Sequence, residues 1–187
     1  DPTDPAFAGA NFTQVSFYTN GADTETDGFD IVAIWAGALF GGSDTSFSLA
    51  YNHNETEVVR QHQVNNINPL SDGNVFNIEN NLPDNRFSFT GNHSWSNYGV
   101  TLRANWYDET IDERNNREPV DSAIMVDLEG RWYINDNFTA ILGANNVFDE
   151  FPNAITTRLS NGLPWPRRTP MGYDGGMWYL KGVYNFD

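Results

Sequence analysis

The sequence lacks several features that would place it in common classes of protein. It has no cysteine among its 187 residues, which excludes a disulfide framework and a thiolate metal site. Lysine and arginine number only 10 against 25 acidic residues, so a chain of net charge −15 has no basic stripe to neutralise nucleic-acid phosphates. No apolar run approaches the roughly 18–20 residues of a transmembrane helix. Nucleic-acid binding and helical membrane spanning are therefore excluded.

Helical periodicity is also nearly absent, and period-two alternation of apolar and polar residues recurs instead, with turn residues between the segments. The clearest case is Ser122–Ile134, where the even positions from Ile124 onward are apolar or glycine and the odd positions from Met125 onward are largely charged. We predict eight strands, an all-β fold, at the following positions: Phe12–Thr19, Phe29–Gly37, Ser46–His53, Arg86–Trp95, Tyr98–Tyr107, Ser122–Ile134, Phe138–Val147 and Trp178–Phe186.

The charged face of these strands indicates their surroundings. Charges could not face a dry core without a large cost, but they suit the water-filled or plugged lumen of an outer-membrane β-barrel whose other face contacts lipid. The charged residues predicted to face the lumen, and to pair across strands or contact a plug, are Arg103, Asp127, Glu129, Arg131 and Lys181. Aromatic girdles at the membrane interfaces would explain the tryptophans near strand ends: Trp35, Trp95, Trp106, Trp132 and Trp178.

The connections between the predicted strands alternate in length. Tight turns are expected at Gly41–Asp44, Ser96–Tyr98 and Asn135–Asn137. Longer links are expected at Asn20–Gly28, Asn54–Asp84, Asp108–Asp121 and Asp149–Gly176. Short periplasmic turns and long extracellular loops are typical of an up-and-down, antiparallel transmembrane barrel.

The segment DNFTAILGANNVFDEFP, Asp136–Pro152, carries a motif made of Asn145, Asn146, Val147, Phe148, Asp149, Phe151 and Pro152. The segment GYDGGMWYLKGVYNF, Gly172–Phe186, closes the alternating pattern on an aromatic residue. Together they resemble the last two strands of TonB-dependent outer-membrane receptors. The segments NGADTETDGFDIVA and NLPDNRFSFTGNHSW, Asn20–Ala33 and Asn81–Trp95, resemble strand entries of the same family.

The resemblance implies that residues 1–187 are the C-terminal part of a receptor barrel, because the family's barrel has about 22 strands. The implied function is TonB-energised uptake of a scarce nutrient, such as a siderophore, oligosaccharide or peptide, in the outer membrane of a Gram-negative bacterium. Neither a plug domain nor a TonB box is recognisable, so the plug and the TonB complex are expected partners through upstream chain. Outer-membrane lipid and the assembly machinery are the other expected partners, with an assembly signal at Trp178, Leu180, Tyr184 and Phe186.

The long link Asp149–Gly176 contains candidate substrate-binding residues. Aromatic and arginine side chains in an extracellular loop suit contact with a sugar, peptide or chelate, and here they are Arg158, Trp165, Arg167, Arg168 and Tyr173. The alternative is that the prolines of this link only stiffen an exposed loop. No cofactor is expected, and no metal site, because His53, His62 and His93 have no ligand spacing.

Three other functions remain open. A complete eight-stranded barrel with a structural or pore role would fit the strand count. An outer-membrane lipid-modifying enzyme would need a nucleophile and base on one face, but Ser94 and His93 are adjacent on a predicted strand and should point to opposite faces, so we expect no catalytic residue. A soluble β-structured binding module is the third.

Overall fold

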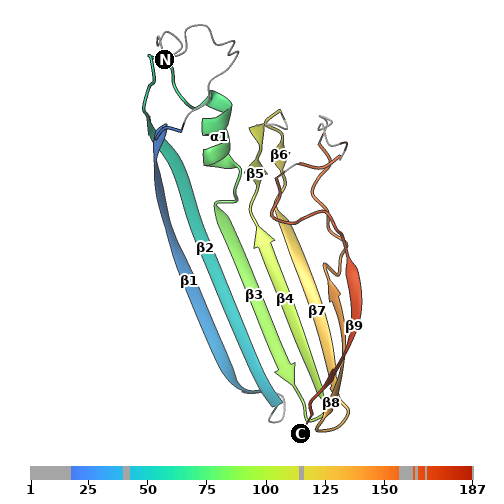
Figure 1. Ribbon diagram of the computed structural model, residues 1–187. Helices are drawn as coiled ribbons and strands as arrows, with labels where there is room; N and C mark the ends of the chain where they lie inside the picture. The colour runs from blue at the N-terminus through green and yellow to red at the C-terminus, as the bar shows by residue number, and fades with distance from the viewer. Residues whose placement is uncertain are drawn as a thin grey trace.

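The computed structural model describes residues 18–39, 43–113, 116–155, 162, 164–166 and 168–186, most of which lie in β-strands. Seven strands form one antiparallel sheet in the order β1-β2-β3-β4-β7-β8-β9 (Figure 1). They are β1 (Ala22–Leu39), β2 (Ser43–Gln61), β3 (Asn85–Ser94), β4 (Tyr98–Tyr107), β7 (Ala123–Tyr133), β8 (Phe138–Asn145) and β9 (Met177–Tyr184). The predicted all-β, up-and-down antiparallel fold is therefore confirmed. Within the described chain β1 and β9 pair on one side only, so the sheet is open.

Seven of the eight predicted strands overlap the seven strands of this sheet. The eighth prediction, Phe12–Thr19, lies outside the described residues except for Tyr18 and Thr19, which are not in a strand. Two predicted tight turns are closed by backbone hydrogen bonds, from Trp95 N to Tyr98 O at 2.7 Å and from Phe138 N to Asn135 O at 3.3 Å. Residues 41–42 of the third predicted turn, Gly41–Asp44, are outside the described residues.

Two of the predicted long links are wrong in part, because β1 and β2 are longer than expected. Residues 22–28 belong to β1 and residues 54–61 to β2, and the two segments pair with one another. At about 3.3 Å per residue, the 18 residues of β1 reach roughly 60 Å, which exceeds the roughly 25 Å apolar band of a membrane barrel. The hairpin therefore extends beyond the band that its apolar residues define.

The remaining elements cluster at the end of the sheet opposite the tight turns (Figure 1). Helix α1 (Asp72–Asn80) begins after Ser71, whose hydroxyl oxygen accepts from the backbone N–H of Asn74 at 3.2 Å. Strands β5 (Thr110–Ile111) and β6 (Pro119–Val120) form a separate two-stranded ribbon. No helix of the described chain is long and apolar enough to cross a membrane.

The two faces of the main sheet have opposite chemistry. The apolar face carries Leu102, Leu128, Trp132, Leu142 and Leu180, of which Leu128 is 43% exposed, Trp132 49% and Leu180 80%. The polar face carries Thr101, Arg103, Asp127, Glu129, Arg131 and Tyr179. Leaving one large apolar side chain in water costs about 1.5–3 kcal/mol. A whole face of them is stable only in an apolar environment, which reverses the arrangement of a soluble sheet.

Aromatic side chains stack along the apolar face near the tight turns. The ring centroids of Trp35 and Phe47 are 5.7 Å apart and those of Tyr98 and Trp132 are 6.4 Å apart, and in each pair the ring planes are nearly parallel. Tyr184 of β9 contacts Phe186 at 4.8 Å. This band matches the predicted girdle at one end of the strands.

Candidate functional site

One row of side chains crosses the polar face of the whole sheet. Successive residues of the row are cross-strand partners, one from each strand, so they project from the same face. From β9 to β1 the row consists of Tyr179, Gly143, Glu129, Thr101, Asn92, Ser46 and Ala36.

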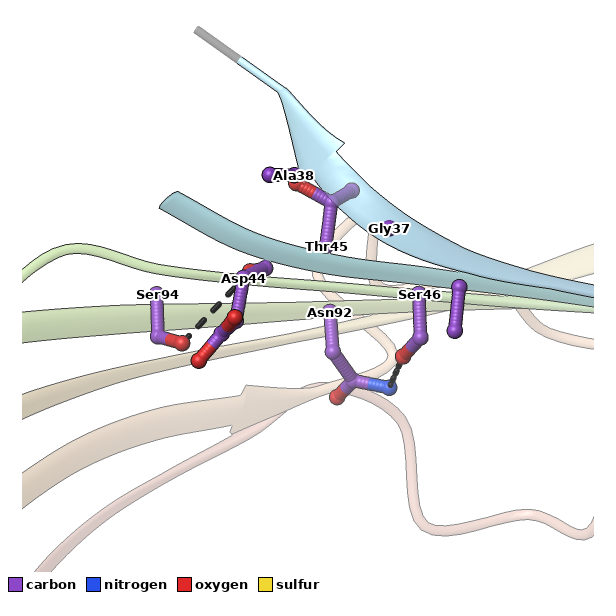
Figure 2. Close-up of a pocket in the computed structure, with 8 residues that line it drawn as sticks. Gly37, Ala38, Asp44, Thr45, Ser46, Asn92 and Ser94 are labelled. Carbon is purple, nitrogen blue, oxygen red and sulfur yellow. Dashed lines mark hydrogen bonds between the residues drawn. The ribbon is translucent and has the colours of Figure 1, made fainter. Parts of the chain in front are cut away.

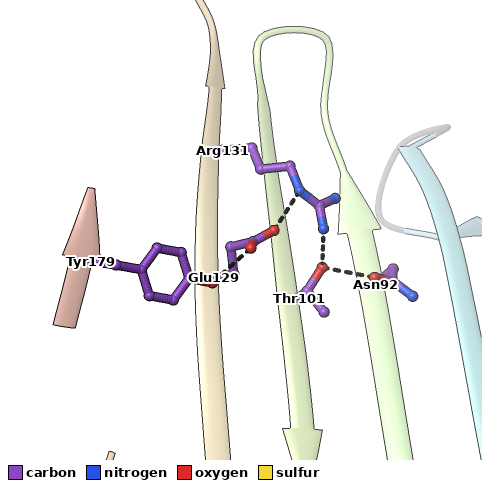
Figure 3. A network of polar contacts seen from close by, with 5 residues as sticks. All are labelled: Asn92, Thr101, Glu129, Arg131 and Tyr179. Carbon is purple, nitrogen blue, oxygen red and sulfur yellow. Dashed lines mark hydrogen bonds and ion pairs between the residues drawn. The ribbon is translucent and has the colours of Figure 1, made fainter. Parts of the chain in front are cut away.

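Hydrogen bonds link most of this row into one network (Figure 3). The Tyr179 hydroxyl donates to Glu129 Oε2 at 2.8 Å, and Arg131 Nε donates to Glu129 Oε1 at 2.8 Å. Arg131 also donates through Nη2 to Thr101 Oγ1 at 2.7 Å, and the Thr101 hydroxyl donates to Asn92 Oδ1 at 2.7 Å. The network satisfies its own charges, so it holds the wall together and leaves little capacity for a ligand.

The other charges predicted for this face lie beside the network. Arg103 is opposite Asp127 in the register of β4 and β7, and Asp127 Oδ1 accepts the backbone N–H of Asn146 at 2.9 Å. Lys181 is exposed and lies opposite Ile141. The expected cross-strand ion pairing takes a different form at Glu129 and Arg131, which pair along one strand because residues two apart share a face.

At its β1 end the row reaches a hollow of about 390 Å³ (Figure 2). It is lined by Ala36, Gly37, Ala38, Asp44, Thr45, Ser46, Asn92 and Ser94. Asn92 Nδ2 donates to Ser46 Oγ at 3.3 Å, and the Ser94 hydroxyl donates to the Asp44 carbonyl oxygen at 3.5 Å. Most of the lining side chains are small, and those of Ser46, Asn92 and Ser94 already take part in these hydrogen bonds.

The candidate residues of the long link Asp149–Gly176 are only partly described, because Arg158 and Arg167 lie outside the described residues. The Trp165 ring stacks with two other rings: its centroid lies 5.2 Å from that of Phe151, with 11° between the ring planes, and 6.1 Å from that of Tyr173, with 15° between the planes. The Tyr173 hydroxyl donates to the Pro166 carbonyl oxygen at 2.6 Å. Trp165 is half-buried in these contacts, and so is Arg168, three residues further along the chain.

The motif Asn145–Pro152 builds the turn that supports the stack. Asn146 has a φ of 48°, and its side chain accepts from the Glu150 N–H at 2.9 Å and donates to the Glu150 carbonyl oxygen at 2.8 Å. Asp149, with a φ of 57°, accepts the Gly176 N–H at 2.7 Å through Oδ1. Asparagine and aspartate tolerate this left-handed backbone region and bond to nearby peptide groups. The motif thus ties both ends of the link Asp149–Gly176 together.

Acidic residues crowd the extended end of the β1–β2 hairpin. Glu25 is directly opposite Glu57, and Asp27 is opposite Glu55. Burial, followed by the nearby Glu55 carboxylate, raises the pKa of Asp84. These acidic side chains lie together in an exposed part of the hairpin, as expected of a chain with net charge −15 whose carboxylates are solvated.

The histidines have structural partners in the described chain. His62 Nε2 lies 2.9 Å from Asp23 Oδ1, and this hydrogen bond lowers the pKa of Asp23. His93 Nδ1 lies 2.6 Å from Thr45 Oγ1 on the apolar face, whereas the Ser94 hydroxyl lies on the polar face. Within the described residues, no group of three or more His, Asp or Glu is placed to hold a metal ion.

Several residues of the site were not predicted. Thr101 and Asn92 carry no special sequence signal, although both fall on the predicted polar alternation. Gly143 gives a signal that could have been used, since a glycine inside a strand often marks close approach of another group. Asn146 is part of the family motif, and its structural role becomes visible only through its backbone angle.

Two solved receptors have similar folds. The crystal structure of the siderophore receptor PiuA from Acinetobacter baumannii aligns with a TM-score of 0.59 and 17% identity, over 87% of this chain and 22% of that chain. The FrpB iron transporter from Neisseria meningitidis (F3-3 variant) aligns with a TM-score of 0.60 and 17% identity, over 89% of this chain and 24% of that one. The fold is that of the barrel wall of TonB-dependent receptors.

This chain spans less than a quarter of the length of either receptor. No family model matches the sequence, and no curated protein matches it. The likeness to TonB-dependent receptors therefore rests on the fold, in agreement with the resemblance of the motifs at Asp136–Pro152 and Gly172–Phe186.

Proposed function

We propose that this chain forms part of the barrel wall of an outer-membrane receptor that takes up a scarce nutrient with energy from TonB. The observation that carries the proposal is the inverted sheet: an exposed apolar face and a hydrogen-bonded polar face, in a fold shared with two iron-uptake proteins. The apolar face contacts lipid, and the polar face borders the lumen. A plug domain and the TonB complex act through chain outside residues 1–187.

The transported solute is proposed at the level of a class. PiuA is named as a siderophore receptor and FrpB as an iron transporter, which makes a ferric chelate the first class to test. Oligosaccharides and peptides remain alternatives, because external loops determine the choice. The aromatic stack around Trp165, with Arg158, Arg167, Arg168 and Tyr173 nearby in sequence, is the proposed contact region for the solute.

The proposal is tested in two steps. The full-length protein should fractionate with the outer membrane of its Gram-negative host, resist carbonate extraction and require detergent for release. Cells lacking its gene should lose uptake of radiolabelled ferric iron under iron limitation, and cells lacking TonB should show the same loss. An aqueous-fraction protein would contradict the membrane placement. Normal uptake in iron-limited mutants, with loss on an oligosaccharide or peptide source, would move the solute to that class.

The same two mutants, lacking the gene or lacking TonB, distinguish the proposed receptor from a small complete barrel and from a lipid-modifying enzyme. A barrel with a structural or pore role would give uptake that is independent of TonB. An enzyme would leave uptake unchanged and alter the extracted lipids of the outer membrane. The proposed receptor predicts neither result.

A further inference from the structure

The alternation of apolar residues does not by itself fix the register of β9. Trp178, Leu180, Gly182 and Tyr184 all lie on the apolar face. A slip of one residue against β8 would turn them to the wrong face, but a slip of two would leave each of them on the apolar face. Because β9 has only eight residues and pairs only with β8 in the described chain, another feature must select among these registers.

Gly143 and Tyr179 form a joint that is specific for one register. They are direct cross-strand partners, and the Tyr179 ring lies over Gly143. A Cβ atom at Gly143 would overlap this ring and come within 2.6 Å of its Cε1 atom. With glycine there, the ring crosses β8 and its hydroxyl reaches Glu129 Oε2 of β7, at 2.8 Å.

The two nearest competing registers lack this joint. A slip of two residues places Tyr179 opposite Ile141 or opposite Asn145, the next residues of β8 on the polar face. Either side chain would occupy the space that the ring needs, and the phenol would no longer align with Glu129. Arg131 holds Glu129 in place from the other side, at 2.8 Å, so the acceptor is itself positioned.

We propose that Gly143, Tyr179 and Glu129 are a register lock, which fixes the last strand relative to β7 across β8. The stagger between strands sets the tilt and circumference of a barrel. The lock therefore determines where the free edge of β9 meets its closing partner and where the terminal aromatic Phe186 lies. It holds for any barrel that contains these strands and does not depend on the solute or on energy coupling.

Residues 1–187 contain no cysteine, so introduced cysteine pairs can report the register in the full-length protein in its membrane once any cysteine elsewhere in it has been replaced by serine. The native register is reported by a disulfide in Thr139→Cys with Val183→Cys, which are cross-strand partners. The two slipped registers are reported by Ile141→Cys with Val183→Cys and by Thr139→Cys with Lys181→Cys. We expect the native pair alone to cross-link efficiently, and Gly143→Ala to lower its yield at least fivefold while one slipped pair appears.

Gly130→Ala is the matched control, because it is also a glycine inside a strand, yet a Cβ there would meet nothing closer than the Leu142 carbonyl oxygen at 3.9 Å. It should leave the cross-linking pattern unchanged. If Gly143→Ala fails to assemble, Gly143→Ala with Tyr179→Ala removes the overlap and should restore assembly with mixed registers. Exclusive native cross-linking in either Gly143 variant would overturn the lock. An unchanged pattern there would leave the proposed uptake function untouched, since no uptake is measured.

Discussion

The two ends of the cross-strand row specify their strands in different ways. At the β7–β9 end, large side chains bridge strands: Tyr179 spans β8 to reach Glu129, and Arg131 continues the network to Thr101. At the β1–β2 end the row finishes in Ser46 and Ala36, and the register rests on a backbone ladder that runs along all of β1. In a long hairpin with a short turn, the turn and the backbone hydrogen bonds fix the register of the two strands. A short edge strand such as β9 needs side-chain contacts to fix its register.

The polar face also changes in character between these two ends. On β7 it carries Asp127, Glu129 and Arg131, but on β1 it carries Val32 and Ile34, which are 62% and 76% exposed. The β1 strand is thus apolar on both faces over Ile31–Trp35. The face that carries Val32 and Ile34 could therefore be exposed to water, like the polar face of β7, or covered by apolar material. Charged substitutions on β1 and β7 distinguish these two possibilities.

The largest effect is expected from a charge on the apolar face of β7. Leu128→Arg should destabilise the inserted protein by about 2–4 kcal/mol, because a cation near the middle of a lipid-facing strand loses its hydration. Val32→Arg, on the polar face of β1, should cost less than about 1 kcal/mol, as an exposed substitution does. Urea unfolding in lipid vesicles, followed by tryptophan fluorescence, compares the two. Equal losses would mean that both faces of β1 lie in apolar surroundings.

A smaller effect is expected at the turn that follows β8. Asn146 is buried, so Asn146→Ala removes two hydrogen bonds with Glu150 and places alanine in left-handed backbone, for a loss of about 2–3 kcal/mol. Asn146→Gly loses the same hydrogen bonds, but glycine adopts the left-handed backbone without strain. This variant should therefore be about 1 kcal/mol more stable than Asn146→Ala. Limited proteolysis of the external link measures both variants. Identical cleavage rates for the two would show that the backbone angle carries no part of the effect.

The sequence predicted the alternating strands well because alternation there has a strong physical cause. Ser122–Ile134 must present leucine and tryptophan to one medium and charges to the other, and β7 occupies nearly the same residues. The extensions of β1 and β2 were missed because residues 23–27 and 54–57 are polar on both faces. A strand that projects into water needs no apolar face, so it has no alternation to detect.

The site was predicted at the level of faces but not of partners. Alternation placed Glu129, Arg131 and Tyr179 on the side away from Leu128, yet a face contains many possible pairs. Which of them bond depends on register, and register depends on Gly143, whose contribution is an absent side chain. Helix α1 was missed for a related reason: it has no apolar stripe, and contacts from another loop support it, such as Arg117 lying 4.2 Å over the Phe76 ring.

At the extended end of the hairpin, charge effects of opposite sign are expected near neutral pH. The raised pKa of Asp84 means that its ionised form is disfavoured in the folded state, so Asp84→Asn should raise the melting temperature at pH 7. The gain should vanish below the ordinary pKa of 3.8, where the carboxyl is protonated in both states. The lowered pKa of Asp23 predicts the reverse, since Asp23→Asn removes stability that is present above pH 3.8. Melting curves at pH 7 and pH 3.5 check both signs, and shifts of the same sign at pH 7 would contradict the assignment.

The smallest effect separates the crowded acidic hairpin from the neutralised network of β7. Glu57 faces Glu25 directly, and like charges opposite one another cost a few tenths of a kcal/mol to about 1 kcal/mol. Glu57→Gln should therefore stabilise the protein slightly at low salt, and the gain should fall as added salt screens the pair. Glu129→Gln is the informative contrast, because it weakens an acceptor shared by Arg131 and Tyr179 and should destabilise at any salt concentration. If Glu57→Gln stabilised the protein equally at every salt concentration, repulsion between Glu57 and Glu25 would not be the cause. The two ends of the sheet would then differ only in packing.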